Sequence, residues 1–214
     1  MITFLFWFII CVALLYLLLA IYCKLRIAKY ILKPGTMVLI IVLAVYGSEL
    51  GTTLSRWVVI ALIFSLLGDI FLMLKEKWFV HGLASFLIAH LVYIAGFWGG
   101  FDVEESVTTL TSVLTGAVLL FIAIWFLLVL SDSVKTHGGI ALLIAVASYI
   151  AIISLMVWSA CLAGVTILIF GSLLFYISDA VLAVNRFKHP FPSAEYIVMS
   201  TYFTAQALFA WSII

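Results

Sequence analysis

Long apolar segments separated by short polar turns make up almost the whole chain. A helix of about 20 apolar residues crosses the core of a bilayer. Segments of this kind lie at 2–23, 34–47, 56–74, 78–97, 107–130, 138–158, 162–184 and 193–214, of which the second is the shortest. The pattern therefore predicts an all-α, polytopic membrane protein with eight transmembrane helices in a single domain over residues 1–214.

The composition fits this class. Of the 214 residues, 68% are hydrophobic and 9% are charged, whereas soluble domains are about 45–50% apolar and about 25% charged. A net charge of +1 without a basic patch argues against a nucleic-acid partner. The three cysteines lie in apolar segments without CxxC spacing, which argues against a disulfide framework. The first segment has no preceding basic residue and no Ala-x-Ala site, so we expect it to be a retained span.

The basic residues predict how the chain is oriented. Nine of the ten fall on the turns of one side: Lys24, Arg26, Lys29, Lys33, Lys75, Lys77, Lys135, Arg186 and Lys188. The other side carries only Arg56 and is otherwise acidic or neutral, with Glu49, Asp102, Glu104 and Glu105. The positive-inside rule makes the basic side cytoplasmic, so both termini face out. In a bacterium this would be a multi-pass protein of the inner membrane.

Two aspartates interrupt the apolar segments in matching contexts. Asp69 follows Gly68 in the third span, and Asp179 follows Ser178 in the seventh. Each lies about 8 Å below the basic boundary at the helical rise of 1.5 Å per residue. An ionisable side chain in hydrocarbon costs at least ~2.5–3.5 kcal/mol, which indicates a partner or a function. The matched contexts predict a parallel repeat of two four-helix halves, 1–100 and 101–214, with a site between them.

Further polar residues recur at helical spacing around these carboxyl groups. The shared faces carry Ser172, Tyr176, Asp179 and Arg186 on the seventh span, His90 and Tyr93 on the fourth, and Tyr202 and Gln206 on the eighth. Side chains lean toward the N-terminus of their helix. The carboxyl groups on the third and seventh spans therefore lean deeper, whereas His90, Tyr202 and Gln206 lean toward the basic side, so all of them approach one depth. We therefore expect one shared polar chamber near the cytoplasmic leaflet. The plain alternatives are an Asp that ties helices together and a packed, hydrogen-bonded His90.

With these motifs placed, the chain resembles the YhhN family of eight-helix membrane proteins, which includes the lysoplasmalogenases. The matching pieces are LKPGTM (32–37), SLLGDIFLML (65–74), HGLASFLIAHLVY (81–93), FYISDAVLAVNRF (175–187) and YFTAQAL (202–208). Gly35 departs from the family pattern, which has Leu after the proline. The resemblance implies hydrolysis of the vinyl-ether bond of a lysoplasmalogen to a fatty aldehyde and glycerophosphoethanolamine or glycerophosphocholine.

This chemistry can be compared with the residues. A vinyl ether is hydrolysed by protonation of its outer alkene carbon, and water then captures the oxocarbenium ion. The reaction needs a carboxylic acid and an anionic group, and two neighbouring buried carboxyl groups can divide into these forms. The sequence does not decide between them; we take Asp179 as the acid and Asp69 as the carboxylate. His90, Tyr202 or Gln206 would then orient the water.

The substrate would be a lysophospholipid that enters from the bilayer with its phosphate at the basic surface. An arginine fork suits a phosphate group. The expected substrate-binding residues are Lys33, Asn185, Arg186, Tyr93 and Tyr176. We expect no cofactor and no metal.

Other functions are compatible with parts of the pattern. A repeat with buried carboxyl groups also suits a lipid or small-molecule transporter or binding protein with proton-linked carboxylates. A metal-dependent hydrolase would use His81, His90 and an Asp, but the chain has no HExxH motif. A structural interaction protein would not account for two carboxyl groups at one depth. The head group, the chain length and the oligomeric state stay open.

Overall fold

The structure, a computed structural model, describes residues 1–100 and 109–214, and these residues are helical without any β-strand. The α-helices are α1 (Ile2–Leu15), α2 (Arg26–Ser48), α3 (Thr53–Met73), α4 (Phe79–Gly100), α5 (Thr109–Ala163), α6 (Thr166–Ala183) and α7 (Ala194–Trp211). The π-helical segments η1 (Tyr16–Tyr22) and η3 (Val184–Lys188) continue α1 and α6, and the 3-10 turn η2 (Glu76–Trp78) precedes α4. The all-α prediction is confirmed.

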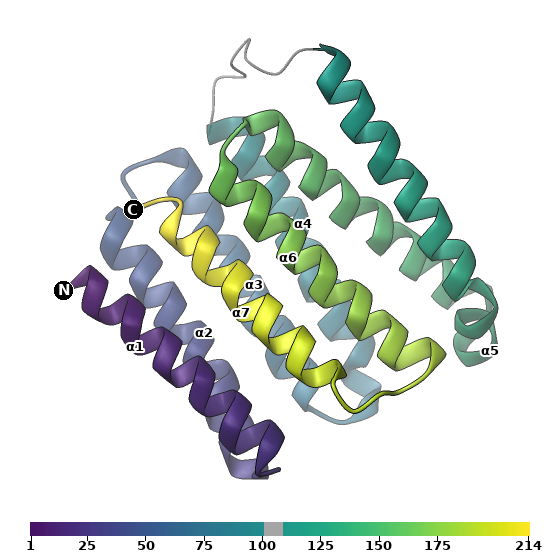
Figure 1. Cartoon of the computed structure of the whole chain (residues 1–214), viewed down its shortest axis with the longest axis horizontal. Helices are drawn as coiled ribbons and strands as arrows, with labels where there is room; N and C mark the ends of the chain where they lie inside the picture. Colours follow the sequence, from purple (N-terminus) through teal and green to yellow (C-terminus); the bar gives the residue numbers. More distant parts are fainter. Residues whose placement is uncertain (101–108) are drawn as a thin grey trace.

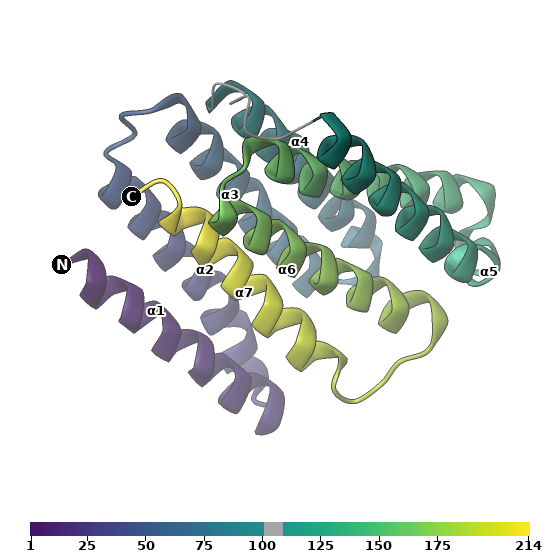
Figure 2. The same ribbon diagram turned by 45° about the horizontal axis from the view of Figure 1, so that its top comes forward.

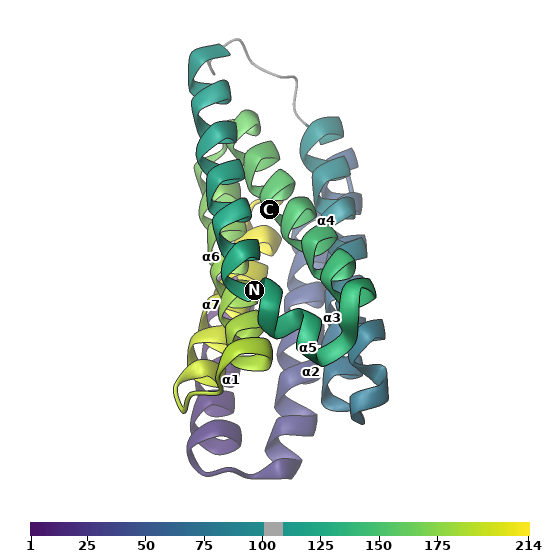
Figure 3. The same ribbon diagram turned by 90° about the vertical axis from the view of Figure 1, so that its right-hand side faces the viewer.

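Six helical segments in the described ranges are long and apolar enough to cross a membrane, as a multi-pass membrane protein requires. One of them is α5, which has 55 residues and non-helical backbone angles at Gly138 and Gly139. Gly139 has a φ of 65°, a conformation that glycine adopts without steric cost. The helix folds back there into two antiparallel arms, 109–137 and 140–163 (Figures 1 and 3). The count of eight spans and the two-fold repeat stay predictions.

Two predicted boundaries are wrong. The second helix begins at Arg26 and contains Pro34 in its interior. Proline cannot donate to the carbonyl four residues earlier, but Ala28 and Leu32 pack against the core and keep the preceding turns helical. The predicted loop at 131–137 is helical up to the glycine pair, so the reversal takes only two residues. Residues 101–108, with the start of the fifth span and the acidic residues Asp102, Glu104 and Glu105, lie outside the described ranges.

Neighbours in sequence pack side by side through the bundle, and α7 returns to lie against α2 and α6 (Figure 2). Helices α1 and α2 form one edge and α5 the other, so α3, α4, α6 and α7 occupy the middle (Figure 1). Large side chains with almost no exposed surface fill this middle, among them Leu62, Tyr93, Phe175 and Phe209. The helices that carry Asp69 and Asp179 are therefore both central.

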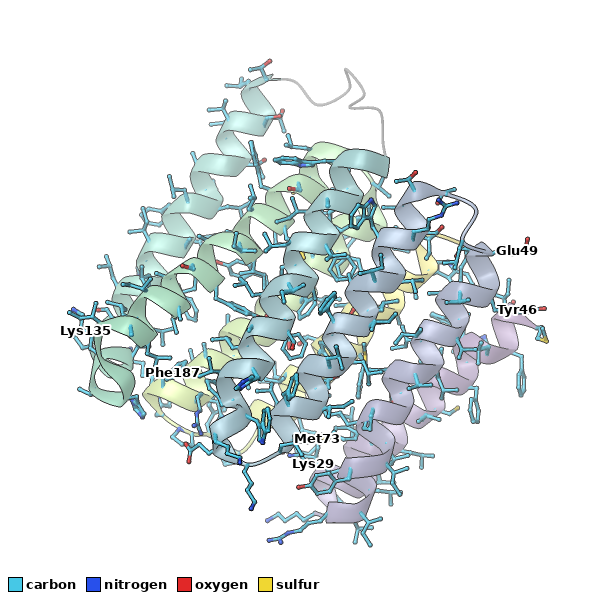
Figure 4. All side chains as sticks on the ribbon, turned by 180° about the vertical axis from the view of Figure 1, so that it is seen from behind. Lys29, Tyr46, Glu49, Met73, Lys135 and Phe187 are labelled. Atoms are coloured by element: carbon cyan, nitrogen blue, oxygen red, sulfur yellow. The ribbon has the colours of Figure 1, made fainter. Side chains whose placement is uncertain are left out.

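The two ends of the bundle differ in charge. Lys29 and Lys135 lie toward one end, and Glu49 lies at the other (Figure 4). Both chain termini lie at the end away from the connection between α1 and α2 (Figure 1). This asymmetry is the one read from the sequence. The assignment of the basic end to the cytoplasm stays a prediction.

Helices α3 and α4 approach closely where glycines face large side chains. A Cβ atom added to Gly68 would lie 2.6 Å from the ring of Phe86, and one added to Gly82 would lie 2.8 Å from the side chain of Leu72. Small residues permit such close contact between membrane helices. The ring of Phe86 is held on its other sides by edge-to-face contacts with Phe175 and Tyr202. Gly68 therefore fixes the position of Phe86.

Replacing Gly68 with Ala should destabilise the bundle, because the added Cβ would overlap the ring of Phe86, which also contacts Phe175 and Tyr202. Overpacking of this kind costs about 1–3 kcal/mol. The matched control is Gly35→Ala, since an added Cβ there meets no atom within 4 Å. The measurement is thermal unfolding of the purified protein in detergent, with a lower melting temperature expected for Gly68→Ala alone. Equal melting temperatures for both variants would contradict this account of the interface.

Candidate functional site

Asp179 on α6 is held by side chains from two other helices. The hydroxyl of Tyr149, on the second arm of α5, donates to Asp179 Oδ2 at 2.5 Å. Nε2 of His90, on α4, lies 3.2 Å from the same oxygen and 3.0 Å from the Tyr149 hydroxyl. Phe175 packs edge-on against the His90 ring at a centroid distance of 4.7 Å. We call Asp179, Tyr149 and His90 the Asp179 group.

The proton arrangement in the Asp179 group follows from its hydrogen bonds. His90 is fully buried, and its Nδ1 has no partner in the described chain. Protonating both ring nitrogens would bury an N–H without an acceptor, so we assign the neutral ring with its proton on Nε2. Both donors then converge on Asp179 Oδ2. No hydrogen bond within the described ranges engages Oδ1, which leaves that oxygen free for a ligand.

Asp179 forms part of the wall of a partly open cavity. The apolar lining residues are Leu72, Phe79, Leu83, Phe86, Phe126, Val146, Ile150, Ile153, Ala180, Leu182, Ala183 and Phe187. Polar lining residues are few: Tyr149, Tyr176, Asp179 and Arg186. An apolar hollow with a few convergent polar groups is the usual form of a small-molecule site.

Asp69 on α3 belongs to a second group. Its Oδ1 lies 3.0 Å from Lys33 Nζ on α2, and its Oδ2 accepts a 2.7 Å hydrogen bond from the hydroxyl of Tyr202 on α7. Asp69 is 1% exposed and Lys33 is 8% exposed, so the ion pair is almost completely enclosed. We call Asp69, Lys33 and Tyr202 the Asp69 group. Both oxygens of Asp69 are engaged within it.

Aromatic rings stand between the two groups. Phe175 makes edge-to-face contact with His90 of one group and with Tyr202 of the other. Phe86 also packs edge-on against Tyr202 and forms part of the cavity wall, whereas Asp69 does not line the cavity. The predicted residues therefore gather in two adjacent groups in place of one shared polar chamber. Depth and helix face can be read from a sequence, but the rings that fill the space between cannot.

Tyr93 and Gln206 form a third pair, deeper in the core. The Tyr93 hydroxyl donates to Gln206 Oε1 at 2.7 Å, and both residues are fully buried. Gln206 Nε2 has no partner in the described part of the chain. Neither residue lines the cavity around Asp179.

The remaining predicted binding residues have different surroundings. Arg186 on η3 lines the cavity, stacks over the ring of Phe79 at 4.8 Å and pairs with Glu76. Tyr176 also lines the cavity. Asn185 accepts a hydrogen bond from the backbone N–H six residues later and so closes the turn after η3. Lys33, expected at a phosphate, is instead engaged with Asp69.

Sequence reasoning missed Tyr149. It lies in a strongly apolar segment, and its spacing matches none of the polar faces predicted for the other spans. The available signal was chemical: a tyrosine hydroxyl inside an apolar helix requires a hydrogen-bond partner.

Within the described ranges, no three His, Cys, Asp or Glu side chains gather closely enough to hold a metal ion. His81, a candidate ligand in the sequence, lies near the basic end. Its ring packs against Trp78 at a centroid distance of 4.8 Å and against Phe71 at 5.9 Å.

Comparison with known proteins finds relatives but no solved structure that matches. The chain is similar to "Lysoplasmalogenase TMEM86B" of Sus scrofa, with 32% identity over 153 residues. It is also similar to "Lysoplasmalogenase TMEM86A" of Bos taurus (30%) and of Homo sapiens (34%). Each alignment covers 72% of this chain and 61%, 63% and 63% of the relatives, respectively. The chain thus spans about three fifths of the length of these curated relatives.

A family model, described as YhhN family, matches residues 28–213. This range begins two residues into α2, runs past the end of α7 and contains both carboxyl groups described above. The resemblance seen in the sequence motifs is confirmed, and the chain belongs to the YhhN family.

Proposed function

We propose that this chain hydrolyses the vinyl-ether bond of lysoplasmalogens, releasing a fatty aldehyde and glycerophosphoethanolamine or glycerophosphocholine. One observation carries the proposal: in the wall of an apolar cavity lies a carboxyl group with one oxygen that accepts no hydrogen bond from the described residues. These three relatives, which are named lysoplasmalogenases, support the same reaction.

The lining of the cavity matches the parts of such a substrate. Its apolar walls suit the alkenyl chain, and the Arg186 guanidinium suits the phosphate. Asp179 and Arg186 both line the cavity, seven residues apart along α6 and η3. A lipid with its phosphate at Arg186 and its chain in the cavity therefore passes Asp179 on the way.

In the proposed reaction, Asp179 in its carboxylic acid form donates a proton from Oδ1 to the outer alkene carbon. The alkene electrons form the new C–H bond, and the ether oxygen shares its lone pair to give an oxocarbenium ion. Water adds to this ion and returns a proton to Asp179, which leaves a hemiacetal. The hemiacetal collapses to the aldehyde and the glycerol hydroxyl, so one water is consumed and the acid is regenerated.

The neighbours of Asp179 hold the acid in position. Tyr149 and His90 both donate toward Oδ2, which directs Oδ1 to the substrate. The same two donors stabilise the carboxylate that remains after proton transfer, because hydrogen bonds to an ionised acceptor are stronger than those to a neutral one. In this proposal His90 is a positioning residue for the acid and does not orient the water.

Asp69 takes a different part from the one expected from the sequence. Lys33 and Tyr202 engage both of its oxygens, and its contact with the cavity is indirect, through Tyr202 and then Phe86. We therefore assign Asp69 as a positioning residue for the cavity wall. Asp179 alone touches the reacting atoms.

Replacing Asp179 with Asn should lower aldehyde release by at least ~10²-fold, the usual contribution of a general acid. Asp132→Asn is the matched control, since it makes the same change on an exposed residue near the basic end. The assay is aldehyde release from a lysoplasmalogen by purified protein in detergent, with an acyl lysophospholipid as the substrate that lacks the vinyl ether. Wild-type rates for a folded Asp179→Asn protein would refute the assignment.

Replacing Asp69 with Asn leaves the Lys33 ammonium buried without its partner, a change that costs roughly 3–5 kcal/mol. We expect a lower melting temperature for Asp69→Asn. The double variant Lys33→Met with Asp69→Asn removes both charges and should recover most of that stability.

The double variant also tests the role of Asp69. If Asp69 positions the cavity wall, the folded double variant should keep measurable aldehyde release. Loss of activity equal to that of Asp179→Asn, in a double variant as stable as the wild type, would mean that Asp69 takes part in the chemistry.

Replacing Arg186 with Ala should raise KM for the lysoplasmalogen roughly tenfold, because a charge-assisted contact to phosphate contributes about 1.5–3 kcal/mol. We expect kcat to change much less, since the phosphate is remote from the bond that breaks. Lys135→Ala removes an exposed cation at the same end of the bundle and should leave both constants unchanged. An unaltered KM for Arg186→Ala would place the phosphate elsewhere.

A further inference from the structure

A second hollow adjoins the Asp179 cavity at the basic end of the bundle. Its lining residues are Phe71, Leu72, Leu74, Lys75, Glu76, Phe79 and Arg186. Leu72, Phe79 and Arg186 also line the Asp179 cavity, so the two hollows meet at these side chains. We call the second hollow the charged pocket.

The charged pocket contains both signs of charge. Arg186 NH2 pairs with Glu76 Oε1, which joins the turn before α4 to η3. Lys75 supplies a second cation. The side chains of Arg186 and Glu76 are 41% and 80% exposed, so an entering ligand can reach both. An exposed ion pair of this kind contributes little to stability, which makes it easy to exchange for ligand contacts.

We propose that the charged pocket binds the zwitterionic head group of the lysophospholipid, with Glu76 as the residue that recognises its amine. The phosphate takes the place of Glu76 on Arg186, with Lys75 beside it. The released Glu76 carboxylate then pairs with the ammonium of the head group. This assignment rests on the proposed function for the identity of the lipid and adds the residues that select its head group.

Charge matching favours a zwitterion over an anionic head. The resting Arg186–Glu76 pair is replaced by two pairs, cation with phosphate and carboxylate with ammonium, so no charge is left alone. A glycerophosphate head without an amine would leave the Glu76 carboxylate unpaired beside a phosphate. The Glu76 carboxylate and the phosphate would repel each other, so such a lipid binds less well.

The placement also agrees with the proposed reaction. Arg186 follows Asp179 by seven residues, which corresponds to about 10 Å of helical rise. The glycerol backbone and the long arginine side chain together span this distance. A phosphate held at the junction of the two hollows therefore leaves the vinyl ether within the Asp179 cavity.

The test compares two substrates with the same alkenyl chain, one with an ethanolamine phosphate head and one with a bare glycerophosphate head. Glu76→Gln should lower the ratio of their kcat/KM values by roughly threefold to fivefold, as expected for an exposed ion pair. Asp132→Asn makes the same chemical change outside both hollows and should leave the ratio as in the wild type. A ratio unchanged by Glu76→Gln, or an equal loss on both substrates, would overturn the assignment.

A binding measurement separates this inference from the proposed function. Saturated 1-O-alkyl analogues of the two lipids lack the vinyl bond, and their binding is measured as the rise in melting temperature at a fixed concentration. The ethanolamine analogue should stabilise the wild type more than the glycerophosphate analogue does, and Glu76→Gln should remove the difference. If this result holds while no aldehyde is formed, the reaction is wrong and the head-group site stands. If the wild type forms aldehyde but binds the two analogues equally well, the proposed reaction stands and the head-group site is overturned.

Discussion

A carboxyl group among apolar helices must find hydrogen-bond donors on other helices, and this requirement organises the bundle. Asp69 on α3 draws Lys33 from α2 and Tyr202 from α7, so its partners come from near the two ends of the chain. The other carboxyl, Asp179 on α6, draws its donors from α4 and α5. Each carboxyl ties three helices together, and the two sets together include every helix from α2 to α7.

The two carboxyl groups meet this requirement to different degrees, and this difference supports the separate roles proposed for them. Both oxygens of Asp69 are engaged by partners, and aromatic rings separate it from the cavity. Asp179 has both its donors on one oxygen and lines an apolar hollow with the other unengaged within the described ranges. A fully partnered group stabilises the fold, whereas a half-partnered group in a cavity is available for chemistry.

Much of this arrangement can be predicted from the sequence, because the membrane restricts what the chain can do. Apolar length predicts the helices, and the cost of a charge in hydrocarbon singles out both aspartates. The separation of the carboxyl groups by Phe86 and Phe175 is not predictable, since it depends on how bulky rings fill the space between helices. Tyr149 and the pairing of Lys33 were missed for a similar reason: helical spacing relates residues on one helix and says nothing about partners on another.

The position of Arg186 and Asp179 on one continuous helical stretch has a consequence for selectivity. A helix changes its length very little, so the distance between the phosphate anchor and the proposed acid stays constant even where other helices shift. The proposed acid would therefore act at a fixed distance from the bound phosphate. The bond to be cleaved would then be selected by its position along the lipid, independently of the length of the chain beyond it.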